Sequence, residues 1–159
     1  MKILVLSDSH GDIDVLAPII KANIHAVQHV IHLGDGCGDM ELFSREYTDT
    51  AFHIVSGNCD LSPAFPEKLI CTISGKKFFI THGHRYGVKK SYDRIRYAAL
   101  EAAADICLFG HTHEPAAFEY EGISFMNPGA VFAMGLIRPT YGIIDLSKNQ
   151  MFSHARLTL

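Results

Sequence analysis

Short apolar runs recur along the chain, and most of them end in a cluster of glycine with aspartate, asparagine or histidine. The unbroken apolar runs at residues 3–6 and 106–109 are typical of strands that are buried on both faces. The same reasoning predicts further strands, with a turn at 74–75 between two of them. These strands are expected at 30–33, 51–55, 69–73, 77–81, 116–120, 123–126, 141–145 and 150–157.

Helical spacing of apolar residues predicts three helices between the strands. The first is expected to have Asp14 as its N-terminal cap and an apolar stripe from Leu16 to Ile24. Pro18 fits this helix only if it lies in the first turn, where its missing N–H is not needed. A short second helix is expected at 39–47, and a third, with the clearest pattern, at 88–104.

The order of these elements predicts an α/β layered domain. Three strands alternate with two helices, then two strands, a helix and a strand follow, and the last part is rich in strands. No linker, repeat or low-complexity segment divides the chain, so residues 1–159 are expected to form a single domain. Open α/β sheets bind ligands beyond the carboxyl ends of their strands, so the polar clusters there should converge on one site.

Composition narrows the class of protein. The net charge of −3 provides no basic field that would recruit nucleic acid or an anionic membrane. No apolar stretch is long enough for a bilayer span or a signal peptide. The four cysteines form no C-x-x-C pair, which argues against a zinc ribbon or a dithiol centre and indicates free thiols. A cytoplasmic protein is therefore expected, and five of its ten histidines fall in the polar clusters.

Three of the polar clusters offer carboxylates or an amide. Asp8 and His10 follow the first strand and could face one cation, although such an aspartate often caps a helix instead. Asp35, in a G-D pair, could bridge two cations about 3.5–4 Å apart, or it could be a turn residue. Asn58, in G-N-C-D, offers a neutral ligand suited to manganese or magnesium, or it too forms a turn.

The two H-x-H pairs are stronger signals. His82 and His84 follow one buried strand, and His111 and His113 follow another. A lone histidine in such a place is more often structural or exposed, but two pairs at strand ends with small neighbours leave room for a metal and a substrate. No arrangement of serine or cysteine typical of a nucleophile competes with them. Together the five clusters favour a metal site with imidazole, carboxylate and amide ligands.

The ordered motifs resemble the calcineurin-like metallophosphoesterase superfamily, and T-H-G-H, N-P-G and the small size resemble its YfcE-like phosphodiesterase branch. The resemblance implies a sandwich of two mixed β-sheets flanked by helices, with the site at the strand ends. It also implies two divalent cations, usually manganese, with iron, zinc, nickel or magnesium as alternatives. The implied ligands are Asp8, His10 and His113 for one metal, Asp35 as the bridge, and Asn58, His82 and His111 for the other.

The implied reaction is hydrolysis of a phosphodiester. The two cations lower the pKa of a bridging water, and the metal-bound hydroxide attacks phosphorus in line. Asn58 and His111, at the mouth of the site, would contact the phosphate. Many members of the superfamily have histidine where this chain has Cys59, and that histidine assists the leaving group. A thiol with a pKa of about 8.5 assists poorly, so substrates with good leaving groups are expected.

Five residues near the motifs have less certain roles. Asp60 either supports the ligands or is a turn residue, and His84 either orients a ligand or is a hydrogen-bonded turn histidine. The superfamily motif G-D-x-x-D has its second aspartate three residues after the first, but here Asp39 comes one residue later than that after Asp35. Asp39 is therefore expected to cap the second helix. Arg85, in a basic cluster, and Arg138, in a stretch that departs from the family pattern, are candidates for contacting the substrate phosphate.

Two other functions are weighed against a phosphodiesterase. A phosphomonoesterase or nucleotidase of the same superfamily is disfavoured by Cys59 and by the absence of an added substrate-binding domain. A non-catalytic scaffold, like the retromer subunit with this fold, is disfavoured by the complete set of ligands. The expected partner is a small phosphodiester, without stable binding of nucleic acid, and a homo-oligomer is compatible with the sequence.

Overall fold

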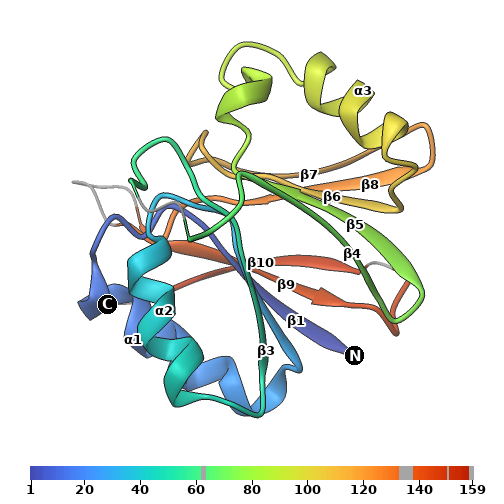
Figure 1. Cartoon of the computed structure of the whole chain (residues 1–159). Helices are drawn as coiled ribbons and strands as arrows, with labels where there is room; N and C mark the ends of the chain where they lie inside the picture. The colour runs from blue at the N-terminus through green and yellow to red at the C-terminus, as the bar shows by residue number, and fades with distance from the viewer. Residues whose placement is uncertain (62–63, 133–137, 150, 158–159) are drawn as a thin grey trace.

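Two five-stranded β-sheets face each other in the computed structural model, which describes residues 1–61, 64–132, 138–149 and 151–157 (Figure 1). The first sheet has the strand order β10-β9-β1-β2-β3, in which β1, β2 and β3 are parallel, β9 is antiparallel to β1, and β10 is antiparallel to β9. Its strands are β1 (Lys2–Leu6), β2 (His29–His32), β3 (Ala51–Ile54), β9 (Thr140–Asp145) and β10 (Phe152–Arg156).

The second sheet has the order β4-β5-β6-β8-β7 and is also mixed. Its central strands β5, β6 and β8 are parallel, and the hairpin partners β4 and β7 run antiparallel at the two edges. These strands are β4 (Lys68–Ile73), β5 (Lys76–Thr81), β6 (Ile106–Leu108), β7 (Pro115–Tyr120) and β8 (Ile123–Pro128).

Helices cover the outer faces of both sheets (Figure 1). On the first sheet lie α1 (Ile13–Asn23), α2 (Cys37–Glu46) and the short 3-10 helix η1 (Ile24–Ala26), while α3 (Asp93–Glu101) lies on the second. A separate apolar core fills the space between the two sheets. The predicted sandwich of two mixed sheets flanked by helices is therefore confirmed.

The start of α1 differs from the prediction. Asp12, not Asp14, is the N-terminal cap, and its side chain accepts a hydrogen bond from the amide of Val15. Pro18 is therefore the sixth residue of the helix rather than part of the first turn. It leaves the carbonyl of Asp14 without the usual helical donor, at an exposed position.

The two other helices also differ at their ends. α2 begins at Cys37 with Gly36 as its cap residue, so the prediction that Asp39 caps this helix was wrong. α3 begins at Asp93, five residues later than predicted: the 3-10 helix η2 (His84–Tyr86) and a left-handed Gly87 are followed by turns and irregular backbone at residues 88–92. The predicted strand at 150–157 is found as β10, although Gln150 lies outside the described residues.

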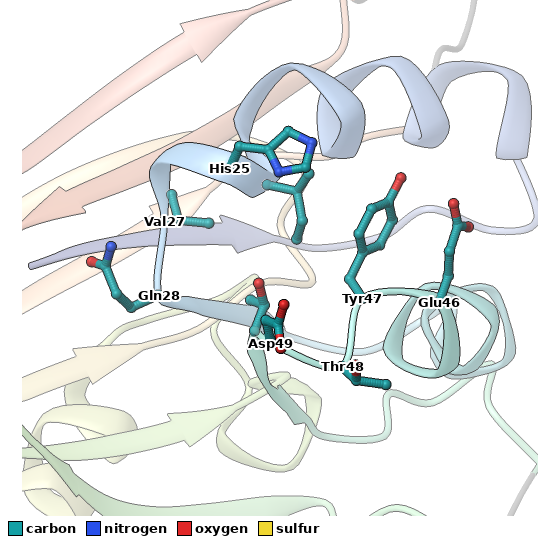
Figure 2. A pocket seen from close by; sticks show the side chains of 9 residues that line it. His25, Val27, Gln28, Glu46, Tyr47, Thr48 and Asp49 are labelled. Carbon is teal, nitrogen blue, oxygen red and sulfur yellow. The ribbon is translucent and has the colours of Figure 1, made fainter.

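The two ends of the first sheet differ in character. The carboxyl ends of β1, β2 and β3 carry the polar clusters, whereas the opposite end has a cavity of about 370 Å³ between η1 and the α2–β3 connection (Figure 2). Side chains that line this cavity include His25, Gln28, Glu46, Tyr47 and Asp49. None of them belongs to a predicted motif. Among the described helices, none is both long enough and apolar enough to span a membrane.

Replacing Pro18 by alanine should stabilise the protein. The new N–H can bond to the carbonyl of Asp14, and the clash of the proline ring with the preceding turn disappears. This gain exceeds the roughly 0.4–1 kcal/mol that proline contributes by restricting the unfolded chain. We expect the free energy of unfolding in urea to rise by about 1–2 kcal/mol in Pro18→Ala. Lys21→Ala, on the exposed side of the same helix, is the control and should change little; an unchanged or lower stability of Pro18→Ala would contradict this account.

Candidate metal centre

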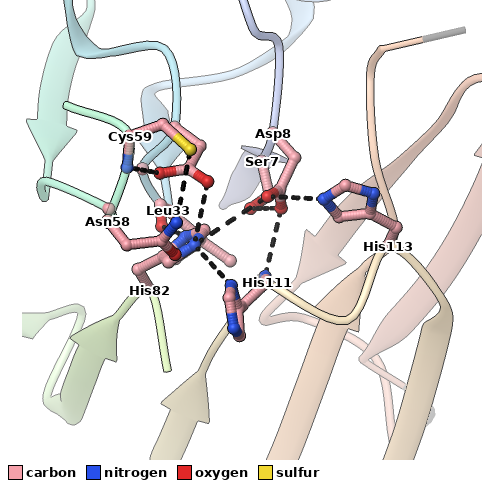
Figure 3. A network of polar contacts seen from close by, with 12 residues as sticks. Ser7, Asp8, Leu33, Asn58, Cys59, His82, His111 and His113 are labelled. Atoms are coloured by element: carbon pink, nitrogen blue, oxygen red, sulfur yellow. Dashed lines mark hydrogen bonds and ion pairs between the residues drawn. The ribbon is translucent and has the colours of Figure 1, made fainter. Parts of the chain in front are cut away.

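Five loops, which follow β1, β2, β3, β5 and β6, bring the predicted ligands together (Figure 3). Donor atoms lie within 4.8 Å of one another in three groups, of which one, His10, Asp35 and Cys59, overlaps the other two. The other two are Asp8, His10 and His113, and Asp35, His82 and His111. They are the groups expected for the two metals, apart from Asn58. Its side chain lies beside His82 in Figure 3 and donates a 3.2 Å hydrogen bond to Cys59 Sγ.

Each of the two buried carboxylates uses its oxygens for different purposes. Asp8 Oδ2 accepts hydrogen bonds from Ser7 Oγ (2.5 Å) and the backbone amide of His111 (3.1 Å). Asp8 Oδ1 faces three imidazoles instead: the Nε2 atoms of His113, His10 and His82 lie 3.1, 3.8 and 3.9 Å away. Although it is buried, this oxygen accepts no hydrogen bond of good geometry from the described residues.

The two oxygens of Asp35 also have different contacts, as those of Asp8 do. Its Oδ1 accepts a 2.8 Å hydrogen bond from the amide of Cys59, while its Oδ2 lies 3.4 Å from His82 Nε2 and 3.9 Å from His10 Nε2. Because His10 and His82 belong to different groups, this oxygen is shared between the two groups. Carboxylate oxygens directed at imidazole nitrogens suit divalent transition-metal cations, so the residues fit such a centre.

The charges of the site depend on these contacts. Burial by itself would raise the pKa of Asp8, but His113, His82 and Ser7 outweigh it and hold that pKa below its usual value. Burial likewise opposes the charge of Asp35, yet His82 and the amide of Cys59 lower its pKa well below the usual range. Both carboxylates are therefore ionised near neutral pH, although their side chains are only 0% and 3% exposed.

The imidazole of His82 is oriented by the backbone. Its Nδ1 lies 2.8 Å from the carbonyl oxygen of Leu33, to which it can only donate, so Nε2 carries the lone pair when the ring is neutral. Burial opposes protonation of this ring, but Asp35 and Asp8 raise its pKa. His111 Nδ1 lies 3.1 Å from that Nε2, and burial with the neighbouring His82 lowers the pKa of His111 to about 4.

The backbone at the site adopts conformations that side chains rarely tolerate. Five predicted ligands have left-handed φ angles: Asp8 (54°), His10 (47°), Asp35 (56°), His111 (69°) and His113 (64°). Each such angle in a residue other than glycine costs about 1 kcal/mol or more, and such angles gather at functional sites. Close backbone approach contributes too, because a Cβ on Gly57 would lie 2.1 Å from Asp35 Oδ1.

Asp60 holds two of the loops together. Its Oδ1 accepts from the amides of Gly36 and Cys37, and its Oδ2 accepts from the amides of Asp35 and Gly57, at 2.7 to 3.0 Å. Because Gly36 and Cys37 begin α2, a carboxylate from the β3 loop satisfies the N-terminus of that helix. Of the two roles considered for Asp60, the structure favours support of the ligand loops.

Asp39 fixes the first loop rather than capping its own helix. Its Oδ2 accepts hydrogen bonds from Ser9 Oγ (2.7 Å) and the amide of Gly11 (2.9 Å), on either side of His10. Ser9 Oγ also lies 3.2 Å from Nε2 of the buried His32. The sequence interpretation missed Ser9 and His32, although His32 stands just before the G-D pair and could have drawn attention.

Asn127 fixes the loop that follows β6. This fully buried side chain donates from Nδ2 to the carbonyl of Gly110 and to Thr112 Oγ1, both at 3.0 Å. These contacts hold the turn that carries His111 and His113. The N-P-G segment had pointed to a family but not to this role.

The three other candidate residues lie in different settings. His84 stands beside the site, with ring centroids 5.4 Å from His82 and 6.2 Å from His111, and its buried Nδ1 has no partner among the described residues. Arg85, a candidate for contacting the substrate phosphate, forms an exposed ion pair with Glu67 at 2.7 Å instead, so its guanidinium is already paired with a carboxylate. Arg138 is exposed, and the predicted contact loop is described only in part because residues 133–137 lie outside the described chain.

Replacing Asp60 by asparagine should loosen the site. Each carboxylate oxygen accepts from two backbone amides, so an asparagine must turn its NH₂ donors toward two N–H donors whichever way it is placed. We expect the free energy of unfolding of the metal-free protein to fall by about 2–4 kcal/mol. We also expect the affinity for manganese, measured by calorimetry, to fall at least roughly tenfold. Asp49→Asn, at an exposed position, is the matched control, and equal affinities in the two variants would refute the role of Asp60.

Comparison with known proteins shows which family the chain belongs to. The profile of the calcineurin-like phosphoesterase superfamily domain matches residues 1–149. The chain is 36% identical to a probable metallophosphoesterase, YsnB of Bacillus subtilis, over 94% of this chain and 86% of that protein. It is 30% identical to the phosphodiesterase MJ0936 of Methanocaldococcus jannaschii, over 94% of this chain and 96% of that protein.

Solved structures show the same fold. A structure described as a novel archaeal phosphodiesterase has a TM-score of 0.79 and 26% identity, covering 99% of this chain and all of that one. YfcE, a phosphoesterase from E. coli, has a TM-score of 0.67 and 23% identity over 92% and 89% of the two chains. Vps29 of Entamoeba histolytica, solved with zinc, has a TM-score of 0.73 and 19% identity over 99% and 98%. The chain has the fold of the YfcE-like phosphoesterases and belongs to the calcineurin-like phosphoesterase superfamily.

Proposed function

We propose that this protein is a metal-dependent phosphodiesterase with a dinuclear centre. The observation that carries the proposal is the pair of buried carboxylates, each of which turns one oxygen toward imidazole nitrogens of the site. In this proposal Asp35 bridges two cations, with manganese favoured. Asp8, His10 and His113 hold the first, and Asn58, His82 and His111 hold the second.

The reaction proposed is attack of water on phosphorus, in line with the leaving group. Two divalent cations, when bound, would supply Lewis-acid activation of water and stabilise the charge that develops on the phosphoryl oxygens. The chain itself would orient the substrate: the amide of the exposed Asn58 side chain and the imidazole of His111 would bind phosphate oxygens. A cavity of about 300 Å³, lined by His10, Asp35 and Cys59 among others, opens beside the carboxylates and gives the substrate room.

Cys59 favours substrates whose leaving group needs no proton. Its thiol is exposed next to Asn58, and the limited burial it has, together with the Asp35 carboxylate, raises the pKa of the thiol. The thiol therefore stays protonated near neutral pH but is a weak acid for an alkoxide. Activated diesters should be hydrolysed more readily than simple alkyl esters.

A scaffold function is the alternative from a different class, and the likeness to Vps29 keeps it under test. The names of the Bacillus and Methanocaldococcus relatives support a hydrolase instead. We propose a small phosphodiester as the substrate, without stable binding of nucleic acid, and a cytoplasmic location. The four cysteines are all free thiols in the structure, as expected in a reducing compartment.

The proposal predicts which of two aryl esters is cleaved. In Mn²⁺, we expect a higher kcat/KM for bis(p-nitrophenyl) phosphate than for p-nitrophenyl phosphate, because the monoester carries a second negative charge and the nearby Arg85 is already paired with Glu67. His10→Gln and Asp35→Asn should each lower diester hydrolysis by at least roughly 10²-fold, since both remove ligands of the centre.

His25→Gln, remote from the site and exposed, is the control for this assay and should behave as wild type. Faster cleavage of the monoester would favour a phosphomonoesterase. A manganese-loaded protein that cleaves neither ester would favour the scaffold.

Replacing Cys59 by histidine tests the leaving-group argument. An imidazolium at this place can donate a proton to the departing oxygen, which is worth about 10²–10⁴-fold when the acid is well placed. We expect Cys59→His to raise kcat for a dialkyl phosphodiester, whose leaving group is an alkoxide, by about 10-fold or more. It should change the hydrolysis of bis(p-nitrophenyl) phosphate little. Cys59→Ser, which supplies no acid, is the control, and an equal gain in both variants would be evidence against the argument.

A further inference from the structure

His29 and His53 form a histidine pair at the end of the first sheet opposite the candidate metal centre. His29 Nδ1 lies 3.0 Å from His53 Nε2, with ring centroids 5.2 Å apart and an angle of 31° between the rings. The two residues lie on the adjacent parallel strands β2 and β3, and both are half-buried. Neither belongs to a motif used in the proposed reaction.

The strand register shows which way the rings point. His29 pairs with Ile3 and His53 pairs with Ile31, and paired residues of a sheet share a face. Ile3 and Ile31 belong to the core between the sheets, so both imidazoles lie on that inner side, at the free edge where β3 ends the first sheet. From His29 to His32, at the carboxyl end of β2, the strand spans about 10 Å, and Asp35 lies beyond that end, so the pair is separated from the carboxylates.

Both rings are neutral near pH 7. Burial lowers the pKa of His29, and burial together with the neighbouring His29 lowers the pKa of His53. A neutral imidazole has one nitrogen with a free lone pair and is a common ligand of zinc, copper and nickel. Two such rings therefore stand side by side with their nitrogens facing each other.

The separation of the two nitrogens selects among metals. With metal–nitrogen bonds of about 2.0–2.1 Å, two nitrogens 3.0 Å apart subtend an angle of about 94° at the metal. That angle fits adjacent positions of a square-planar, tetragonal or octahedral ion, whereas a tetrahedral ion needs a separation of about 3.3–3.4 Å. Cu²⁺ and Ni²⁺ prefer the former geometries and bind imidazole more tightly than Mn²⁺.

We propose that His29 and His53 form a second transition-metal site, which binds one Ni²⁺ or Cu²⁺ ion through His29 Nδ1 and His53 Nε2. The cation displaces the hydrogen that the two nitrogens share and lies to one side of the line that joins them, with each ring turned so that its lone pair points at the ion. The ring that carried this hydrogen keeps its proton on its other nitrogen. Both rings stay neutral, so the exchange releases no proton. Water completes the coordination, because the pair lies at a half-exposed edge of the sheet.

Nickel binding to the intact protein tests the site. By equilibrium dialysis against Ni²⁺ at pH 7.5 (about one unit above the usual pKa of histidine), wild type should bind one more equivalent than the double variant His29→Gln/His53→Gln. Each single variant should weaken this extra binding by at least roughly tenfold, since one imidazole is lost. His25→Gln, which removes an exposed histidine from the same end of the sheet, should bind as much nickel as wild type. Equal nickel content in wild type and the double variant would overturn the proposal.

A second measurement uses only the wild-type chain, in case the variants fold poorly. Added Ni²⁺ is paramagnetic and should broaden the backbone amide signals of Ile3, His29, Ala51 and His53 in addition to those around the candidate centre. Mn²⁺ at one to two equivalents should broaden the centre alone. Broadening by Ni²⁺ that is confined to the centre would contradict the second site, and this result does not depend on whether the centre hydrolyses phosphodiesters.

Discussion

The burial of two carboxylates, Asp8 and Asp35, is the constraint on which the rest of this structure depends. An ionised carboxylate removed from water is strongly destabilising unless donors or opposite charges surround it. Here one oxygen of each accepts protein hydrogen bonds, and the other faces imidazoles that come from three different loops. The loops must therefore meet at the strand ends, and the strands must run parallel where they carry these loops.

Side chains outside the ligand set keep the loops in place. Asp60 joins the loops after β2 and β3, Asp39 joins α2 to the loop after β1, and Asn127 holds the turn after β6. All three bind backbone groups rather than ligand side chains, so they fix the left-handed conformations directly. Their contacts offset conformations that are unfavourable by themselves, because a residue in a strained conformation persists only where its surroundings determine it.

The part of this arrangement that could be predicted follows from local periodicity. Buried strands such as β1 and β6 were found from unbroken apolar runs, and the convergence of their loops follows from parallel pairing. Errors arose where a local signal had a competitor: Asp12 and Asp14 are both good caps, and the apolar stripe from residue 88 begins five residues before α3, in turns that follow the left-handed Gly87. The role of Asp60 could not be predicted from local sequence patterns, because Asp60 caps a helix that begins 23 residues earlier in the chain.

Buried charge and strained backbone also connect metal binding to folding. Within the described part of the chain, Asp8 Oδ1 faces only the imidazoles of His113, His10 and His82, and the pKa of His82 is raised by Asp35 and Asp8. A cation between these groups compensates the carboxylates without requiring the imidazoles to be protonated. Such a cation would bind the folded chain in preference to the unfolded chain, because the proposed ligands come from positions as far apart as Asp8 and His113. Metal occupancy and folding are therefore linked equilibria, and a change in a supporting residue acts on both at once.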